Sequence, residues 1–167
     1  VRSWGSAAGH ALRMAARITR RAEVAVVRAI DPERLSVIRN YCEPTEMESH
    51  IGVRLVDYDP ASGLIDLDDL RAAVGEQTAA VYFETPSYLG VIEQQGAEIA
   101  AIARAAGAET IVGVDPISLG VLSSPVDFGA DIVVGTIQPL GVHMHTGGGV
   151  GGFIASRDED RYAHQYP

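Results

Sequence analysis

Short apolar runs and amphipathic stretches alternate along the whole chain. A short apolar run bounded by turn residues predicts a buried strand, and apolar residues at helical spacing predict a helix. Such alternation is typical of successive βα units, whose strands lie parallel in one sheet with helices on both faces. The sequence therefore predicts a three-layer α/β/α fold with a mainly parallel sheet, and its 167 residues suffice for a single domain over residues 1–167.

Caps and turn residues help to place the elements. Asp31 and Pro32 open one helix, and Gly107 ends another. Ser6, a small hydroxyl residue at the entry of the first helix, suits an N-cap. Helices are expected over Ser6–Thr19, Pro32–Tyr41, Asp66–Val74 and Gln95–Ala106, and strands over Glu23–Val27, Gly52–Val56, Ala79–Phe83, Thr110–Val114, Ala130–Val134 and Gly151–Ala155. The charged and aromatic residues 157–167 are expected to contain no further element.

The composition argues against several classes of function. The net charge of -9 and the scattered arginines leave no basic stripe for nucleic acid. No apolar run approaches the roughly 20 residues that span a bilayer, and the first residues show no signal pattern, so a cytoplasmic protein without membrane contact is expected. Cys42 is the single cysteine, which excludes an internal disulfide and favours an unreactive thiol.

The chain contains no lysine, because all 13 of its Lys and Arg positions are arginine. Lysine is the usual Schiff-base nucleophile of enzymes that bind carbonyl compounds. A covalent amine mechanism in these residues would therefore depend on the amino group of Val1 alone.

Polar residues follow two strands at the points where the strands end. Asp115 comes directly after the strand Thr110–Val114, and Ser87 and Tyr88 follow the preceding strand. Because ligands of open parallel sheets bind beyond the carboxyl ends of the strands, these loops are expected to converge on one site. Asp115 lies in front of Pro116, however, and suits a simple turn equally well.

Three other patterns point to binding less strongly. Gly5 and Ser6 open the first helix, whose backbone amides can hold a phosphate or carboxylate, although a plain N-cap is the more frequent meaning. The glycines of residues 147–152 match the dinucleotide fingerprint formally, but a strand follows where a helix is required, which excludes that function. His143 and His145 alternate along an extended segment and could face one metal, but no third ligand is evident.

Three segments taken together resemble the P-protein of the glycine cleavage system, specifically its subunit 1. They are Thr85–Glu93, Val114–Gly120 and Gly129–Gly135 with Gln138–Gly141, and the similarity runs from Ala15–Thr19 to Gly151–Ala155. The resemblance implies the large-domain fold of type I pyridoxal phosphate enzymes, the aspartate aminotransferase type. It also implies a longer protein, with an amino-terminal region before Val1 and a small domain after Pro167.

The resemblance implies a function shared between two subunits. Such an enzyme, a glycine dehydrogenase (decarboxylating), removes the carboxylate of glycine and passes the aminomethyl group to a lipoyl carrier (H) protein. Its pyridoxal phosphate would be held by a lysine of subunit 2. The stretch Gln138–Leu140 stands where subunit 2 has the His-Lys-Thr segment that contains this lysine, so this chain is expected to be the non-lysine subunit and inactive alone. Asp115 falls where type I enzymes place the aspartate that pairs with the pyridine nitrogen, and it is expected to be a vestige or an interface residue.

Contacts with the partner in a hetero- or homo-oligomer are expected from the loops near Trp4–Ser6, Ser87–Gly90 and His143–Gly149. Three alternatives remain open. The chain could be an inactive scaffold domain that keeps the fold for assembly, or a lyase that binds pyridoxal phosphate without a lysine and relies on Asp115. The third alternative is metal binding through His143 and His145.

Overall fold

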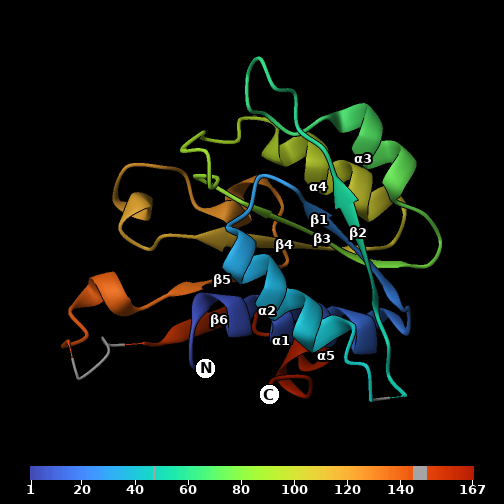
Figure 1. Ribbon diagram of the computed structural model, residues 1–167, viewed down its shortest axis with the longest axis horizontal. Coiled ribbons are helices and arrows are strands. Elements are labelled where there is room, and N and C mark those ends of the chain that lie inside the picture. Colours follow the sequence, from blue (N-terminus) through green and yellow to red (C-terminus); the bar gives the residue numbers. More distant parts are fainter. Residues whose placement is uncertain (47, 145–149) are drawn as a thin grey trace.

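The structure, a computed structural model, describes residues 1–46, 48–144 and 150–167. A six-stranded sheet with the order β2-β1-β3-β4-β5-β6 crosses the molecule between two layers of helices (Figure 1). The strands are β1 (Glu23–Val27), β2 (Gly52–Val56), β3 (Thr78–Glu84), β4 (Glu109–Val114), β5 (Ile132–Thr136) and β6 (Gly152–Ser156). Strands β1 to β5 are parallel and β6 is antiparallel to β5. The predicted three-layer fold with a mainly parallel sheet is confirmed.

Helices cover both faces of this sheet. On one face lie α1 (Trp4–Thr19), α2 (Pro32–Cys42) and the short α5 (Asp160–Ala163), and on the other lie α3 (Leu67–Ala73) and α4 (Gly96–Ala105) (Figure 1). Short 3-10 turns occupy Ser118–Gly120, Pro125–Phe128 and Gln138–Leu140 in the loops after β4 and β5. Within the described ranges no helix has the length and apolarity needed to cross a membrane.

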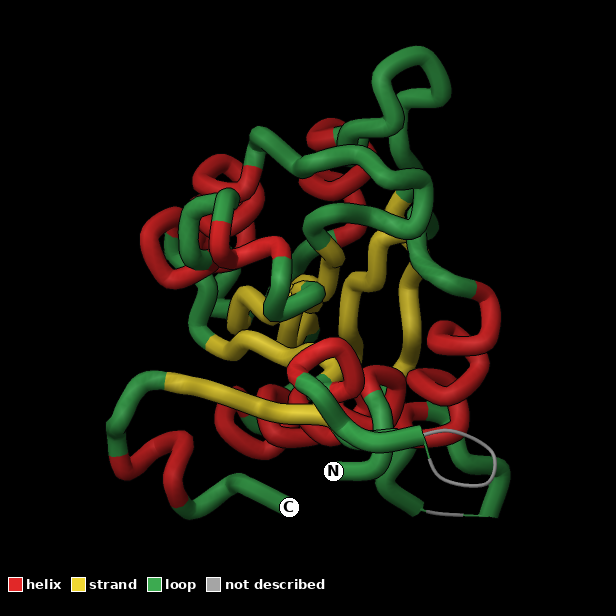
Figure 2. Tube along the Cα trace, turned by 90° about the vertical axis from the view of Figure 1, so that its left-hand side faces the viewer, coloured by secondary structure: helices red, strands yellow, loops and turns green. Residues whose placement is uncertain are grey.

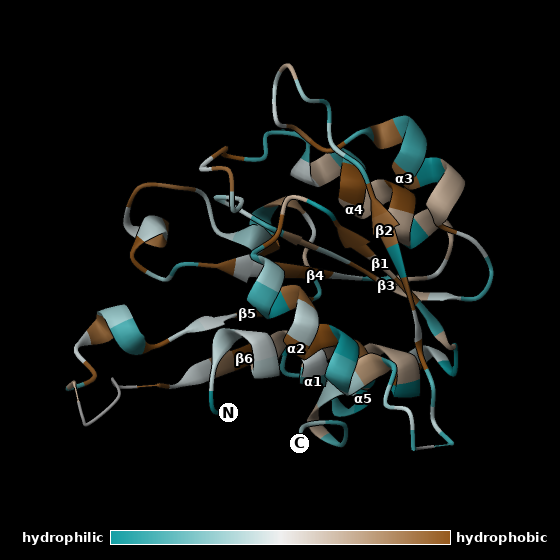
Figure 3. Cartoon of the chain, viewed as in Figure 1, coloured by the Kyte–Doolittle hydropathy of each residue, from teal (hydrophilic) through white to brown (hydrophobic). Residues whose placement is uncertain are grey.

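The two central strands are buried along their whole length. Every residue of β3 and of β4 is buried, which is the pattern of parallel strands covered on both faces. Alternate side chains point to opposite layers, so Tyr82 and Ile111 pack toward α1 while Phe83 and Val112 pack toward α4. Figure 3 shows the apolar residues concentrated on these strands. Polar side chains can therefore be placed only at the two ends of the central strands.

The first helix begins two residues earlier than expected, and its N-cap is Ser3 rather than Ser6. The amide of Ser6 donates to Ser3 Oγ at 3.2 Å, and the amide of Ser3 donates to Ser6 Oγ at 3.0 Å. This reciprocal pair is a capping box, in which two serine hydroxyls satisfy amides that the helix itself leaves without partners. Ser6 thus belongs to the first turn of α1.

The fifth strand also lies two residues later than expected. Ala130 and Asp131 precede β5, and Asp131 closes the gap to the neighbouring strand. The Asp131 amide donates to the Thr110 carbonyl at 2.9 Å, and the Thr110 amide donates to Asp131 Oδ2 at 2.8 Å. A side-chain oxygen therefore takes the place of a backbone carbonyl as the acceptor at the start of this strand pair. The apolar pattern of the sequence does not show which kind of acceptor is used, so it places the start of the strand too early.

The expectation that no element follows the last strand is wrong. The short helix α5 packs against α1 and buries Tyr162, which is 2% exposed. The Tyr162 hydroxyl donates to Glu109 Oε2 at 2.9 Å, and Arg161 forms an ion pair with the same carboxylate. Burial raises the pKa of Glu109, although both partners favour its charged form. Glu109 thus ties the end of the chain to the amino end of β4.

Cys42 lies at the end of α2 and is fully buried. Burial raises the pKa of its thiol to about 12, so the thiol stays protonated at neutral pH. Because the thiolate is the nucleophile of cysteine chemistry, this environment supports the expectation of an unreactive thiol.

We expect Tyr162→Phe to lower the free energy of unfolding by about 1.5 kcal/mol, because a buried carboxylate loses one hydrogen-bond donor. Tyr166→Phe is the matched control, since Tyr166 is exposed and its hydroxyl meets only Ser156 Oγ at 2.9 Å. Urea unfolding followed by circular dichroism measures both. Equal effects of the two substitutions would contradict the role assigned to the Glu109 contact.

Candidate functional site at the carboxyl edge of the sheet

The loops that follow β3, β4 and β5 meet at one edge of the sheet, together with the start of α1. These loops lie on the left of Figure 1, and in Figure 2, which views the molecule from that side, they lie in front of the strands. The amide of Thr85 donates to the Gly113 carbonyl at 3.0 Å, which joins the ends of β3 and β4. The amide of Gly152 donates to the Val1 carbonyl at 2.8 Å, which holds the chain before α1 against β6. The predicted convergence of loops is therefore present.

Exposed apolar side chains are concentrated at this edge. Of the 13 large apolar side chains that are exposed in the described residues, 11 lie in these three loops. We call them the apolar rim: Tyr88, Leu89, Ile92, Ile117, Leu119, Val121, Val126, Ile137, Leu140, Met144 and Val150. Since exposed apolar surface marks interaction sites, the loops that hold the rim are the part of the described surface best suited to bury against another molecule.

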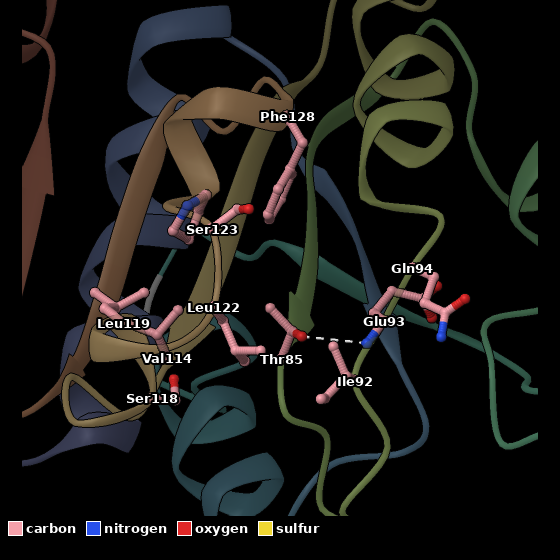
Figure 4. A pocket seen from close by; sticks show the side chains of 11 residues that line it. Thr85, Ile92, Glu93, Gln94, Val114, Ser118, Leu119, Leu122, Ser123 and Phe128 are labelled. Carbon is pink, nitrogen blue, oxygen red and sulfur yellow. Dashed lines mark hydrogen bonds between the residues drawn. The ribbon is translucent and has the colours of Figure 1, made fainter.

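A cavity of about 250 Å³ opens between the loop after β3 and the loop after β4 (Figure 4). Its walls are apolar side chains, among them Ile92 and Phe128, and neutral polar groups such as the hydroxyls of Thr85 and Ser118. Glu93 is the only ionisable residue of the lining, and its carboxylate holds the loops in place: it accepts from the Ile65 amide at 2.9 Å and from the Gln95 amide at 2.8 Å. The cavity can bind a small neutral or apolar group, but its lining offers no available acid or base.

A buried polar cluster lies at the same edge, on the α1 side of the sheet. The indole of Trp4 donates to the Tyr82 hydroxyl at 3.2 Å, and that hydroxyl donates to Glu84 Oε1 at 2.7 Å. Arg34 donates to Glu84 Oε2 at 2.6 Å. The guanidinium carbon of Arg34 lies 3.9 Å from the centroid of the Trp4 ring, which closes the circle of contacts. The cluster joins α1, α2 and β3.

The polar cluster fills the space beside the neighbouring strand. A Cβ atom added to Gly113 would lie 2.6 Å from Tyr82 Oη and 2.9 Å from Trp4 Nε1, closer than real Cβ contacts. Glu84 is 5% exposed, and burial raises the pKa of its carboxyl even though Arg34 and Tyr82 favour the charged form. The cost of removing the charged carboxylate from water thus exceeds the stabilisation that it gains from Arg34 and Tyr82, as is common for buried ion pairs.

The structure brings some of the predicted site residues to this edge in local roles. Asp115 follows β4 at the expected place, where its Oδ1 accepts from the Ile117 amide at 2.9 Å. This is the turn-forming contact that the sequence offered as the alternative. Gln138 begins a 3-10 turn after β5, and its amide donates to Thr136 Oγ1 at 3.1 Å. Gly5 lies in the first turn of α1 against Val37, where an added Cβ atom would lie 3.1 Å from Val37 Cβ.

Ser87 and Tyr88 lie in the loop after β3, as expected. Tyr88 is 59% exposed, and its amide donates to the Ala29 carbonyl at 3.2 Å, so its ring is available to a partner. The Oγ atom of Ser87 is buried and has no hydrogen-bond partner within the described part of the chain. The backbone of Ser87 is held through Val91, whose carbonyl accepts from the Ser87 amide at 2.8 Å.

The histidine pair lies only partly within the described residues, so metal binding there stays a hypothesis. His143 is exposed, and His145 lies outside the described residues. A group of three or more metal-ligating side chains is absent from the described ranges. The part of the loop at residues 145–149 that was expected to contact a partner likewise lies outside the described residues.

The fold defines the class of protein. A sphingosine-1-phosphate lyase of Burkholderia pseudomallei K96243 superposes with a TM-score of 0.71 at 16% sequence identity, over 98% of this chain and 38% of that one. Such a likeness establishes the fold alone, which is the large-domain fold of type I pyridoxal phosphate enzymes.

Residues 3–167 match the family profile described as glycine cleavage system P-protein, and the chain belongs to this family. It is 39% identical to the probable glycine dehydrogenase (decarboxylating) subunit 1 of Pyrococcus furiosus and 35% identical to that of Staphylothermus marinus, over 98% of its length in each case. A structure of glycine decarboxylase (P-protein) in inhibitor-bound form superposes with a TM-score of 0.86 at 33% identity over 100% of this chain.

The chain spans only about a third of these relatives: 36% of the Pyrococcus protein, 34% of the Staphylothermus protein and 35% of the crystallised P-protein. The family resemblance expected from the sequence is confirmed over nearly the whole chain.

The described residues do not fit pyridoxal phosphate as a complete site. The stretch Gln138–Leu140 has no amine for a covalent bond to the cofactor, which enzymes of this fold normally hold through a lysine. The amide of Ser6 donates to Ser3 Oγ in the capping box at 3.2 Å, and the amide of Ala7 donates to the Ser3 carbonyl at 2.9 Å, so neither of these two amides is available to a phosphate. On the α1 side the polar cluster already occupies the space beside Gly113. Together these contacts leave little for a cofactor to bind.

Sequence reasoning missed the polar cluster. The sequence places Glu84 only at the start of a polar loop, and it indicates no role for Arg34 or Tyr82. A signal is nevertheless present, because a glutamate at the end of a strand that is otherwise apolar must find a buried partner. Its partner on α2 is 50 residues earlier in the chain, and no local pattern identifies a pair so distant.

We expect Glu84→Gln to leave the protein folded and to change its pH dependence. The folded pKa of Glu84 lies above its unfolded value of 4.5, so the folded state retains a proton that the unfolded state has lost as pH rises above 4.5. The free energy of unfolding of the wild type therefore falls through that window, whereas the glutamine variant has no such titration. The stability of Glu84→Gln relative to wild type should rise between pH 4.5 and pH 7 in urea titrations.

Glu76→Gln, in an exposed loop, is the matched control and should differ from wild type by less than about 0.5 kcal/mol at every pH. A fall in the relative stability of Glu84→Gln with rising pH would show that the ion pair with Arg34 outweighs burial.

Proposed function

We propose that this chain acts as the non-lysine part, subunit 1, of a glycine decarboxylase P-protein. In this function it assists the decarboxylation of glycine and the transfer of the aminomethyl group to a lipoyl carrier protein. It does so in a complex with a lysine-bearing subunit 2, whose lysine holds the pyridoxal phosphate. Family membership and the names of the relatives at 35–39% identity support the proposal.

The observation that carries the proposal is the combination of an interaction surface with an incomplete site. The carboxyl edge presents the apolar rim and a cavity, yet the lining of the cavity has no available acid or base, and the stretch Gln138–Leu140 has no amine. Residues arranged in this way can bind, orient and exclude water, and in this proposal the covalent chemistry comes from the lysine of subunit 2.

Each part of the edge has a distinct role in the proposed complex. The apolar rim, with Tyr88 and Leu140 among its most exposed members, buries against subunit 2 and removes water from the junction. The polar cluster fixes the start of α1 relative to β3, so the loops near Trp4–Ser6 and Ser87–Gly90 are presented in one arrangement. Asp115 and Gln138 lie in turns at this junction and act as interface residues.

The exchange of the glycine carboxyl group with labelled bicarbonate tests the proposal. The protein is mixed with a lysine-bearing subunit 2, lipoyl carrier protein and pyridoxal phosphate, and each component is also assayed alone. We expect exchange only in the mixture. If subunit 2 alone is equally active while this protein is folded, the chain is a scaffold domain without a part in the reaction.

Charged substitutions in the rim are expected to weaken the complex. Leu89→Asp and Leu140→Asp should each reduce the affinity for subunit 2 by about 10-fold or more, because burying an unpaired carboxylate costs at least about 1.4 kcal/mol. Both residues are exposed, so the fold should be unaffected. Analytical ultracentrifugation of the mixture measures the affinity.

Ala101→Asp is the matched control, since Ala101 is an exposed residue on α4, a helix that contains no residue of the rim. It introduces the same charge and should leave the affinity within about twofold of wild type. Equal loss in all three variants would indicate a general charge effect and contradict the assigned surface.

A further inference from the structure

A second cavity, of about 490 Å³, lies on the helical layer formed by α1 and α2. It is lined by His10, Arg13 and Arg17 of α1, Asn40 and Tyr41 of α2, and Pro167. Figure 1 shows α1, α2 and the carboxyl end of the chain side by side in its lower part. With a rise of 1.5 Å per residue, Arg13 lies about 15 Å along α1 from Ser3, so this cavity is separate from the carboxyl edge of the sheet.

The three basic residues of α1 occupy one face of the helix. Positions 10, 13 and 17 are three and four residues apart, which places their side chains in a row above the cavity. No carboxylate of the described residues forms an ion pair with Arg13 or Arg17, whereas the four ion pairs of the described structure use other arginines. In a protein with a net charge of -9, this is a local accumulation of positive charge without a counterion.

Hydrogen bonds to neutral acceptors hold both guanidinium groups in place. Arg13 donates to the Tyr41 carbonyl at 2.9 Å and to Ser49 Oγ at 2.7 Å. Arg17 donates to the side-chain oxygen of Gln165 at 2.9 Å and also to its carbonyl. A guanidinium has five N–H donors, and Arg17 uses two of them, so three remain. The groups are fixed before any ligand binds, which lowers the entropy cost of binding.

The remaining walls indicate the size and character of a ligand. The Asn40 side chain carries an amide donor, and the ring of Tyr41 provides an apolar wall that His10 meets edge-on at 4.7 Å between centroids. Burial lowers the pKa of His10, and the positive charges of the amino terminus, Arg17 and Arg13 lower it further. The positive charge at the cavity therefore comes from Arg13 and Arg17, and its volume of about 490 Å³ lies in the range of small-molecule sites.

We propose that this cavity binds the phosphate group of a phosphorylated small molecule, with Arg13 and Arg17 as the principal donors and Tyr41 as the wall for its organic part. Two fixed guanidinium groups and an amide suit a tetrahedral oxyanion that accepts several hydrogen bonds at once. The site is independent of the proposed reaction at the carboxyl edge.

Calorimetric titration at low ionic strength tests the proposal, with inorganic phosphate and phenyl phosphate as probes. We expect saturable binding of both, and tighter binding of phenyl phosphate because its ring packs on Tyr41. Arg17→Gln should weaken binding by about 10-fold, the loss of one charge-assisted contact worth about 1.4 kcal/mol. Equal affinity for the two probes would show that Tyr41 provides no wall for an organic group and would overturn the assignment to a phosphorylated molecule.

Because Arg17→Gln also removes contacts with Gln165, a second variant keeps the test independent of folding. Asn40→Asp places a negative charge in the cavity wall without touching the hydrogen bonds of either arginine, and it should weaken binding by a similar factor. Arg104→Gln, on α4 across the sheet, changes the net charge by the same amount and should leave binding within about twofold of wild type.

Absence of saturable binding to the wild-type protein would overturn the proposal. Unchanged binding in Asn40→Asp would also overturn it, and so would an equal loss in Arg104→Gln, since either result would show attraction to the whole protein rather than to this cavity.

Discussion

Burial of the two central strands on both faces is the constraint on which the rest of the structure depends. Helices must cover both sides of β3 and β4, so charged groups can enter the middle of the sheet only at the strand ends. The same combination of side chains is found at both ends of the central strands. Glu84, at the carboxyl end of β3, is held by an arginine and a tyrosine, and so is Glu109, at the amino end of β4. Each carboxylate joins the sheet to helices that would otherwise contact it through apolar side chains alone.

These buried carboxylates contribute to geometry more than to stability. Burial raises the pKa of both carboxyl groups in spite of their cationic partners. In neither pair does the attraction to the arginine fully offset the desolvation of the carboxylate. The ion pairs instead fix geometry, because a carboxylate that accepts from two side chains holds both of those side chains in defined positions. At the carboxyl edge this fixes the start of α1 beside the loop after β3, where the apolar rim and the cavity are found.

Local patterns were sufficient for most of the fold and for little of the site. Asp31 and Pro32 define the start of α2 through contacts within one turn, and the structure agrees with the sequence there. Local patterns do not predict hydrogen bonds between side chains and groups that are far apart in the sequence. Asp131 replaces a strand carbonyl opposite Thr110, and the buried Tyr162 donates to Glu109, 53 residues earlier in the chain. Asp115 was placed correctly, but its turn-forming contact could not be distinguished from a cofactor contact by sequence alone.

Gly113 limits how relatives of this chain can vary. A methyl group at this position would collide with the Tyr82 hydroxyl and the Trp4 indole, so the three positions can change only in concert. A relative with a side chain here must have a smaller residue in place of Tyr82, or an α1 that starts farther from the sheet. Coordinated substitution at these positions, rather than the loss of any single residue, would therefore mark the lineages in which this edge of the fold was rebuilt.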